Sequence, residues 1–386
     1  MPTPQKSYET VQKKHNNQSG WIQMILDFDN NEKYLHDQKK LAEMLFALTE
    51  QPDLKKQIRD DFADTLKKIW FDTTKINDVL DSFFENIEKW IASWKSVFEM
   101  EIDQYNLLKS SWVREKFREA QKNRVKTIFE QIWWMIPGNT DIIDYWTWHW
   151  EVWKKFKDES HCKVTEVDVV DYRVPEVKSD LDIDFKQFNW YEIPWGKKFN
   201  YWVLTNVAHH EEDNEKIIEE LTKKVNKGLA VIETVPNLDE WNFSKKEFLK
   251  CLPEANTKLS KNILENYLKD IRFNDLVSEE EGERNIDKAR KRNHASDWRR
   301  NRVVTEPMNK VPVPWTYEHR LGWLIRFANH GWLPSEITDY GYDMAWLKDK
   351  HVGYKFIKAN SLDKLPEWYQ FPEFKKEYKW QKALEK

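Results

Sequence analysis

The feature that most constrains the fold is a regular alternation of short apolar runs and helical segments in the middle of the 386-residue chain. Four runs read as β-strands: Thr140–Tyr145, Lys163–Val170, Tyr201–Asn206 and Leu229–Thr234. Between the last two, Asn214–Val225 has the apolar spacing of an amphipathic helix, which the pair Lys227-Gly228 ends as a glycine stop signal. Strand–helix–strand alternation of this kind predicts a parallel sheet with helices on its faces.

The region before the first strand is predicted to be helical. From about residue 41 to residue 128, apolar residues recur at spacings of three, four and seven, as in Ile58, Phe62 and Leu66. Such a stripe is typical of the core of a helical bundle, although a groove for a cofactor or partner has the same pattern.

The region after the last of the four runs contains a helical part and a further strand pair. Residues 243–300 are helical in pattern and highly charged, which indicates an insertion, and 336–343 with 352–358 predict an antiparallel strand pair at the sheet edge. The expected division is an N-terminal helical region over 1–125, an α/β domain over 126–360 and a C-terminal tail over 361–386.

Charge and cysteine content exclude several classes of protein. The net charge of −4 does not suit a chain that coats nucleic acid or an anionic membrane. Cys162 and Cys251 are neither a disulfide framework nor a metal-ligand set, so no metal is expected. Residues 1–17 lack the apolar stretch of a signal peptide, and no uncharged run reaches the ~18 residues of a membrane span. We therefore expect a cytoplasmic protein without a membrane partner.

The composition is unusual in its glycine and tryptophan content. The chain has 9 glycines and 22 tryptophans, whereas glycine normally makes up ~7% of residues. Together the two types account for 31 of 386 residues, about 8%, which an ordinary protein also reaches. The excess of one type thus nearly equals the deficit of the other. The simplest explanation is that many of these tryptophans stand for glycine codons translated under the wrong genetic code. The codon UGA is read as tryptophan in some codes and as glycine in others.

The segment from Asp144 to Trp150 has the layout of a ligand-binding turn. Trp146, Trp148 and Trp150 stand where glycines would complete Asp-x-Gly-x-Gly-x-Gly after a strand. Such a turn uses glycine because its backbone adopts positive φ and approaches the ligand closely. Asp168 follows at the end of the next run, where an acid can accept hydrogen bonds from ribose hydroxyls.

A second interpretation of these tryptophans is one aromatic face of a strand, because they alternate with period two. Other tryptophans, however, directly follow Asn189, Pro194 and Pro314. Asn-Gly and Pro-Gly are turn pairs, whereas Asn-Trp and Pro-Trp are not. These positions favour the turn.

With glycine restored, DYWTWHWEV (144–152) resembles motif I of the class I S-adenosylmethionine-dependent methyltransferases. The resemblance continues in order through four further segments: VTEVDVVDY (164–172), FNWYEIPW (188–195), VLTNVAHHEED (203–213) and KGLAVIETVPN (227–237). It covers about 60% of the chain, residues 125–358, and leaves out the N-terminal helices.

The resemblance implies an α/β fold: a Rossmann-like methyltransferase sheet, mostly parallel with an antiparallel edge strand, beside an N-terminal helical domain. It implies S-adenosylmethionine as cofactor and a small-molecule or macromolecular methyl acceptor. The implied cofactor-binding residues are Asp144, Trp146, Trp148, Trp150, Asp168, Asn189 and Asn206. Asn189 departs from the family, which has Asp there, and nearby Asp184 is the alternative contact to the adenine. The three indoles depart more severely, because they fill the place of the methionine moiety and strain the turn by ~1–2 kcal/mol each.

His209 and His210 are the candidate catalytic residues, since they follow the strand whose carboxyl end faces the ligand in such sheets. A histidine there can deprotonate an acceptor, because its pKa lies near neutrality. The other interpretation is that it caps a helix or packs against the cofactor.

The basic stretch 284–302 also has two interpretations. Its eight Arg and Lys residues suit the phosphates of an RNA acceptor, or they form a solvated helix face that balances Glu279, Glu280 and Glu281.

Two functions follow from the sequence. The first is a methyltransferase with an undetermined acceptor. The alternative is a non-catalytic interaction protein with a helical part and a Rossmann-like domain, whose cofactor pocket the tryptophans occlude.

Overall fold

The structure is a computed structural model of the whole chain. It describes residues 51–68, 74–92, 126–145, 150–168, 183–187, 196–210, 213–236, 243–269, 271–304, 316–342 and 350–376, with the single residues 106 and 238. The chain forms two compact units. The first comprises 1–121, 291–315 and 345–347, and the second comprises 122–290, 316–344 and 348–386.

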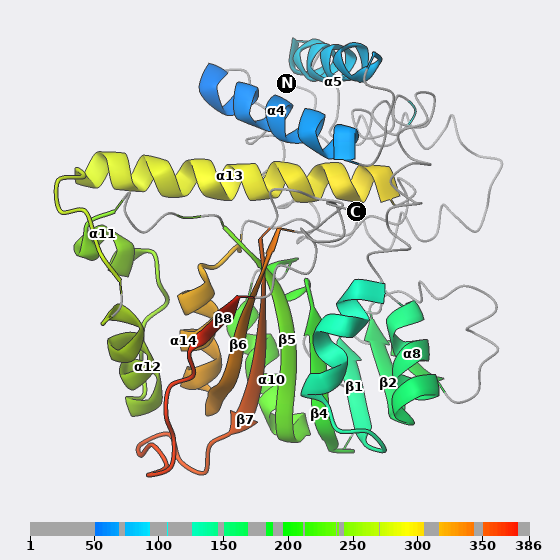
Figure 1. Cartoon of the computed structure of the whole chain (residues 1–386), viewed down its shortest axis with the longest axis vertical. Coiled ribbons are helices and arrows are strands. Elements are labelled where there is room, and N and C mark those ends of the chain that lie inside the picture. The colour runs from blue at the N-terminus through cyan, green and yellow to red at the C-terminus, as the bar shows by residue number, and fades with distance from the viewer. Residues whose placement is uncertain are drawn as a thin grey trace, which may run out of the picture. The chain divides into compact units, whose positions relative to one another are not determined.

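The second unit contains an eight-stranded sheet in the order β3-β2-β1-β4-β5-β7-β6-β8 (Figure 1). The strands are β1 (Asp141–Tyr145), β2 (Lys163–Asp168), β3 (Ile183–Gln187), β4 (Phe199–Thr205), β5 (Val225–Val235), β6 (Trp332–Tyr342), β7 (Lys350–Lys358) and β8 (Phe374–Lys376). Strands β1 to β5 pair in parallel, whereas β7 runs antiparallel to both β5 and β6. The order 3-2-1-4-5 reverses between β1 and β4, and ligands bind at this switch point in open α/β sheets.

One face of the sheet is covered by the helical residues 126–132, the short helix η1 (Trp133–Met135) and α8 (Trp150–Ser160). Their apolar side chains share one buried cluster with the strands, which includes Ile128, Ile132, Val152, Trp153, Phe156, Ile142, Val203, Ala230 and Ile232. Residues two apart in a strand share a face. Asp144 therefore lies on the face of Ile142, and Thr234 on the face of Ile232. We call this the α8 face.

The opposite face is covered by α10 (Asn214–Lys224) and α14 (Arg320–Asn329). The ring of Phe327 in α14 contacts Trp202 in β4 and Phe356 in β7, with centroid distances of 6.2 and 4.6 Å. The indole N–H of Trp332 donates to the Thr222 hydroxyl in α10 at 2.8 Å. Helices on both faces and a mostly parallel sheet confirm the expected fold class.

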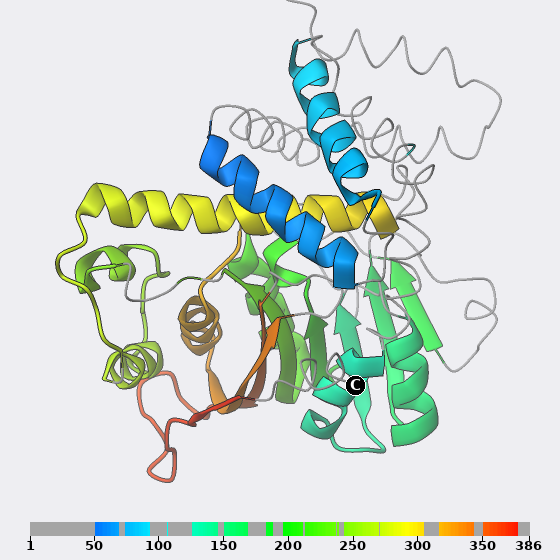
Figure 2. The same cartoon turned by 45° about the horizontal axis from the view of Figure 1, so that its top comes forward.

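The charged region 243–300 is helical, as expected. It forms α11 (Lys245–Lys250), α12 (Lys258–Leu268) and α13 (Glu279–Val304). Helix α12 begins with a capping box in which Thr257 and Ser260 exchange side-chain and backbone hydrogen bonds. It packs beside α14, as Figure 2 also shows.

Two predictions about the sheet are corrected. Gly228 does not end a helix: Asp213 caps α10, the helix ends at Lys224, and β5 begins at the next residue. Gly228 lies inside β5, where a side chain would meet the Phe356 carbonyl oxygen at 2.8 Å and the Tyr201 ring at 2.9 Å. The antiparallel pair β6–β7 is present, but β8 extends the sheet beyond β6 and comes from the segment expected to be a tail.

In the first unit, α4 (Pro52–Lys68) packs on α5 (Ile76–Ala92). The predicted stripe is buried, since Ile58, Phe62 and Leu66 are at most 5% exposed. Arg292 donates two hydrogen bonds to the carboxylate of Asp61, one of them 2.7 Å long. Helices in the described residues are all too short or too polar to cross a bilayer.

Candidate active site

Asp144 is a buried carboxyl group near the carboxyl end of β1, where it is the second-last residue of the strand. Its side chain is fully buried, and neither carboxyl oxygen has a hydrogen-bond partner among the described residues. Its register partner in β2 is a second acid, Glu166. Burial raises the pKa of Asp144 well above its ordinary value, and the neighbouring charges of Glu166 and Asp168 raise it further. The nearby backbone N–H of Tyr145, which makes no hydrogen bond of regular geometry to the carboxyl group, opposes this shift more weakly. A carboxyl group in this position binds a proton or a cation.

Asp168 is the last residue of β2, at the same edge of the sheet, and is 1% exposed. Its position at the carboxyl end of the strand next to β1 is the one predicted for a residue that accepts hydrogen bonds from ribose. Asp184, the alternative adenine contact, lies in β3 with an exposed side chain that pairs with Lys186 at 3.0 Å.

Asn206 follows β4 directly and has the left-handed backbone conformation, with φ of 54°. Asparagine tolerates this region better than most residues. Its backbone N–H donates to the Ile232 carbonyl at 2.7 Å, and its Oδ1 accepts from the Thr234 hydroxyl at 3.2 Å. Its Nδ2 is buried and has no partner among the described residues. Because Thr234 is on the α8 face, the Asn206 amide and the Asp144 carboxyl lie on one face, on either side of the switch point.

His209 lies in the short helix η2 (Ala208–His210) and is fully buried. Its Nδ1 is 2.7 Å from Oε2 of Glu233 in β5. The other oxygen of Glu233 accepts from the backbone N–H groups of Val207 at 3.0 Å and Ala208 at 2.7 Å. A carboxylate only accepts, so it selects a His209 ring with a proton on Nδ1.

Aromatic rings enclose His209. The Tyr317 ring stacks on it at 4.9 Å between centroids, and the ring of His210, itself buried, lies 4.3 Å away. The Thr316 hydroxyl donates to the His209 carbonyl oxygen. The structure thus brings His209 and His210 together at the carboxyl ends of β4 and β5, with His209 fixed by contacts on several sides.

Glu233 is the residue that sequence reasoning missed. It lies within the apolar run Leu229–Thr234, where a charged residue is rare unless it is paired. An acid in a fully buried strand therefore signals a partner, and the histidines after β4 are the nearest candidates along the sheet edge.

Three predicted site residues, Trp146, Trp148 and Asn189, lie outside the described residues. Trp150 begins α8, and only its backbone is described. The basic stretch forms part of α13, as a helix. Its Arg292 is bound to Asp61, so this guanidinium already has an anionic partner. Among the described residues, no cluster of three or more His, Cys, Asp or Glu side chains has the arrangement of a metal site.

Comparison with family models and with curated proteins gives no match. Among solved structures, the chain resembles the cyclase SpnF, with 8% identity over 61% of this chain and 80% of that one and a TM-score of 0.36. It resembles magnesium protoporphyrin IX methyltransferase from Synechocystis PCC 6803 with bound SAH, with 10% identity over 63% and 85% of the chains and a TM-score of 0.35. It also resembles the N-methyltransferase NodS from Bradyrhizobium japonicum in complex with S-adenosylhomocysteine, with 8% identity over 62% and 87% and a TM-score of 0.36. At such values the fold assignment rests on this chain's own strand order and directions.

Proposed function

We propose that the protein is an S-adenosylmethionine-dependent methyltransferase whose cofactor lies across the carboxyl ends of β1, β2 and β4. One observation carries the proposal. Asp144 and Asn206 are buried, lie on one face on either side of the switch point, and each leaves polar atoms without a partner among the described residues. Buried polar atoms are almost always hydrogen-bonded, so such a pair indicates a ligand with both donors and acceptors.

These residues fit the chemistry of the cofactor. S-adenosylmethionine supplies an electrophilic methyl group on a cationic sulfonium, and it carries an ammonium group and ribose hydroxyls. The Asp144 carboxyl suits a cationic group, and a cation beside it would offset the cost of its burial. Asp168 suits the ribose hydroxyls, and the unpaired Nδ2 of Asn206 suits a carboxylate or carbonyl oxygen.

His209 is proposed to act as the base toward the acceptor, and Glu233 is proposed to position it. The Glu233 carboxylate keeps the proton on Nδ1 and also stabilises a positive charge that develops on the ring when Nε2 takes a proton. His210 is proposed as the second histidine of the acceptor side. The proposal specifies the cofactor and the base, and it leaves the acceptor to be identified.

The tryptophans at 146, 148 and 150 are proposed to be glycines in the natural polypeptide. Buried tryptophans elsewhere support a mismatch between residue and environment. Among the described residues, the indole N–H groups of Trp153, Trp202 and Trp323 are buried without a hydrogen-bond partner, although a buried indole N–H usually has one. Trp332, by contrast, donates to Thr222.

Calorimetry with S-adenosylhomocysteine tests the cofactor site. It is carried out on the chain as written and on the triple variant Trp146→Gly, Trp148→Gly, Trp150→Gly. We expect the glycine form to bind and the tryptophan form to bind at least tenfold more weakly, since ~1.4 kcal/mol of strain or steric exclusion produces that difference. Absence of binding by the glycine form would refute the methyltransferase proposal.

The alternative, a non-catalytic interaction protein, is favoured by one observation, namely three tryptophans at positions where the predicted turn requires glycine. Peptide mass spectrometry of the protein from its native source separates the two. Tryptophan at all three positions, combined with no cofactor binding, supports the interaction protein. Glycine at these positions supports the enzyme.

A further inference from the structure

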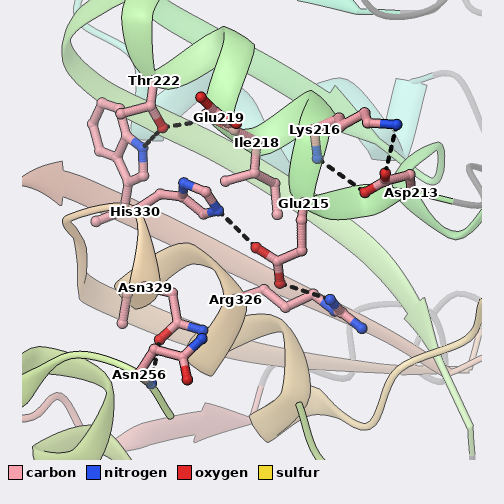
Figure 3. Close-up of polar contacts among 12 residues, drawn as sticks. Asp213, Glu215, Lys216, Ile218, Glu219, Thr222, Asn256, Arg326, Asn329 and His330 are labelled. Atoms are coloured by element: carbon pink, nitrogen blue, oxygen red, sulfur yellow. Dashed lines mark hydrogen bonds and ion pairs between the residues drawn. The ribbon is translucent and has the colours of Figure 1, made fainter. Parts of the chain in front are cut away.

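The loop that carries His209 and His210 leads into α10, and the first turn of this helix holds a network of charged groups. Asp213 caps the helix by accepting from the Lys216 backbone N–H at 3.2 Å. Glu215, two residues later, is contacted by two side chains, Arg326 in α14 and His330 at the C-terminal end of that helix (Figure 3). Its Oε2 lies 2.7 Å from Nε2 of His330, and its Oε1 accepts from Nη1 of Arg326 at 2.7 Å. Burial alone would raise the pKa of Glu215, but these partners outweigh it and lower the pKa.

Arg326 reaches a second acid with the rest of its guanidinium. Its Nε donates to Oε1 of Glu318 at 3.1 Å, and its Nη2 donates to the same oxygen. The Glu318 side chain is 9% exposed and that of Arg326 is 20% exposed. Because the pair is largely withdrawn from water, it is screened less by salt than a surface ion pair. Arginine thus joins Glu215 to Glu318 through three N–H groups, which the single ammonium of lysine cannot reproduce.

Glu318 belongs to the segment that covers His209. The two residues before Glu318 contact His209. Thr316 donates a hydrogen bond to the His209 carbonyl oxygen, and Tyr317 stacks on the His209 ring. Arg326 therefore connects residues 316–318, which contact His209, to helix α10, which begins after the loop that carries His209.

The close approach of Glu318 to α14 has a visible consequence in the sequence. Gly322 lies inside this helix, where glycine costs about 1 kcal/mol relative to alanine. A Cβ at this position would come within 2.7 Å of Oε2 of Glu318. The helix thus retains one of the chain's few glycines where the Glu318 carboxylate passes over it.

We propose that Arg326 is a positioning residue. Its guanidinium clamps residues 316–318 to the first turn of α10 and so holds the His209 ring in its orientation toward Glu233. The catalytic meaning of this clamp rests on the proposed methyl transfer, whereas the clamp itself can be tested without an acceptor.

The test combines amide hydrogen exchange of residues 207–210 with the ring ¹⁵N resonances of His209, in the full chain and in Arg326→Lys. We expect exchange in this loop to accelerate roughly tenfold, equivalent to about 1.4 kcal/mol, because one charge contact replaces three N–H bonds. The His209 ring resonances should shift, whereas those of the buried His351 should not. Arg272→Lys makes the same chemical change at an exposed position and should leave both measurements unchanged.

Two results would overturn the clamp. One is loop exchange within twofold of the native chain together with unshifted His209 resonances. The other is equal acceleration in β1 and β2, which would show a general loss of stability. If Arg326→Lys does not fold, Glu215→Gln takes its place: it weakens the α10 side alone, and we expect a smaller acceleration, about threefold, confined to the same loop. Calorimetry with S-adenosylhomocysteine on the triple glycine variant tests the methyltransferase proposal separately, since its failure leaves the exchange result standing.

Discussion

Two buried carboxyl groups at the same edge of the sheet have opposite surroundings. Glu233 in β5 is fully buried and accepts from two backbone N–H groups and the His209 ring. Asp144 in β1 is also fully buried, but its oxygens have no hydrogen-bond partner among the described residues. Residue type and burial are therefore similar, whereas the supply of donors differs, and Asp144 also has the acidic neighbours Glu166 and Asp168.

The difference separates a group that builds the site from a group that binds within it. A satisfied buried carboxylate fixes its neighbours, and its removal leaves donors without acceptors. An unsatisfied one costs stability until a ligand or a proton reaches it. Natural proteins retain such costs mainly at functional sites. The comparison therefore supports the proposed positioning role of Glu233 and the proposed ligand-binding role of Asp144.

The largest expected effect is that of Glu233→Ala. Three buried donors lose their acceptor, so we expect the free energy of unfolding to fall by roughly 3–5 kcal/mol. Urea denaturation measures this. A loss below about 1 kcal/mol would show that water or another group replaces the carboxylate, and it would remove the distinction from Asp144.

Glu233→Gln is the matched variant and tests the His209 tautomer. The amide oxygen can still accept from Val207 and Ala208, so the amide NH₂ group must face Nδ1 of His209. The ring proton then moves to Nε2. We expect ring ¹⁵N spectra to show this exchange, with a stability loss of about 1–2 kcal/mol. A ring that stays protonated on Nδ1 would contradict the positioning role.

Asp144→Asn is expected to change stability and binding in opposite directions. The free energy of unfolding should rise by roughly 1–3 kcal/mol at pH 8, because the variant avoids the cost of burying a carboxyl group, either charged or protonated, without hydrogen-bond donors. In the triple glycine variant, affinity for S-adenosylmethionine should fall at least tenfold when Asp144→Asn is added, a change of about 1.4 kcal/mol. Denaturation and calorimetry on the same sample test the pair of effects. A variant that is both less stable and equally able to bind would assign Asp144 to the structure alone.

The pH dependence of that stability gain has a definite sign. Because the pKa of Asp144 is raised in the folded chain, the folded state binds its proton more tightly than the unfolded state. The native chain therefore loses stability as pH rises from about 4, the unfolded pKa, through the raised folded pKa. Asp144→Asn lacks this loss. The stability difference between variant and native chain should thus be larger at pH 8 than at pH 5, and a difference that shrinks as pH rises would contradict the assignment.

A smaller effect is expected at Asn206, which lies between the two carboxyl groups in the sheet order. Ala and Gly both remove the amide that bonds to Thr234, but only alanine is strained at φ of 54°. We expect Asn206→Ala to be less stable than Asn206→Gly by about 1 kcal/mol in urea denaturation. Equal stabilities would show that the backbone relaxes on substitution.

The smallest effect is expected at an exposed pair on α10. Lys223 and Glu219 are 2.9 Å apart with more than half of each side chain exposed. Lys223→Ala should leave the urea midpoint unchanged within error, at low and at high salt, since solvent screens such pairs. A clear fall in the urea midpoint would show that exposed ion pairs on α10 affect the loop before the helix. The contrast between these pairs and the buried carboxyl groups would then be weaker.

The elements with a clear period were predictable from the sequence. The strand runs at Thr140–Tyr145 and Leu229–Thr234 and the helix from Asn214 were found because burial imposes alternation on a strand and a 3.6-residue period on a helix. The error at Gly228 has a physical reason. Glycine after a helix usually marks its end, but here a neighbouring carbonyl and a tyrosine ring exclude any side chain from the strand. Strands β3 and β8 were missed because short exposed strands carry little apolar pattern.

The sequence by itself determined the fold class, the placement of Asp144, Asp168 and Asn206 at strand ends, and the presence of two histidines after β4. These follow from local patterns, because strand, turn and polar residue are neighbours in the chain. Only the tertiary structure decided that Glu233 pairs with His209, that Tyr317 stacks on its ring, and that Arg326 joins Glu215 to Glu318. It also decided which of the buried carboxyl groups lacks donors. Except for Arg326 and Glu318, which are 8 positions apart, these contacts join residues 24 to 111 positions apart. No local pattern encodes which distant donor meets which acceptor.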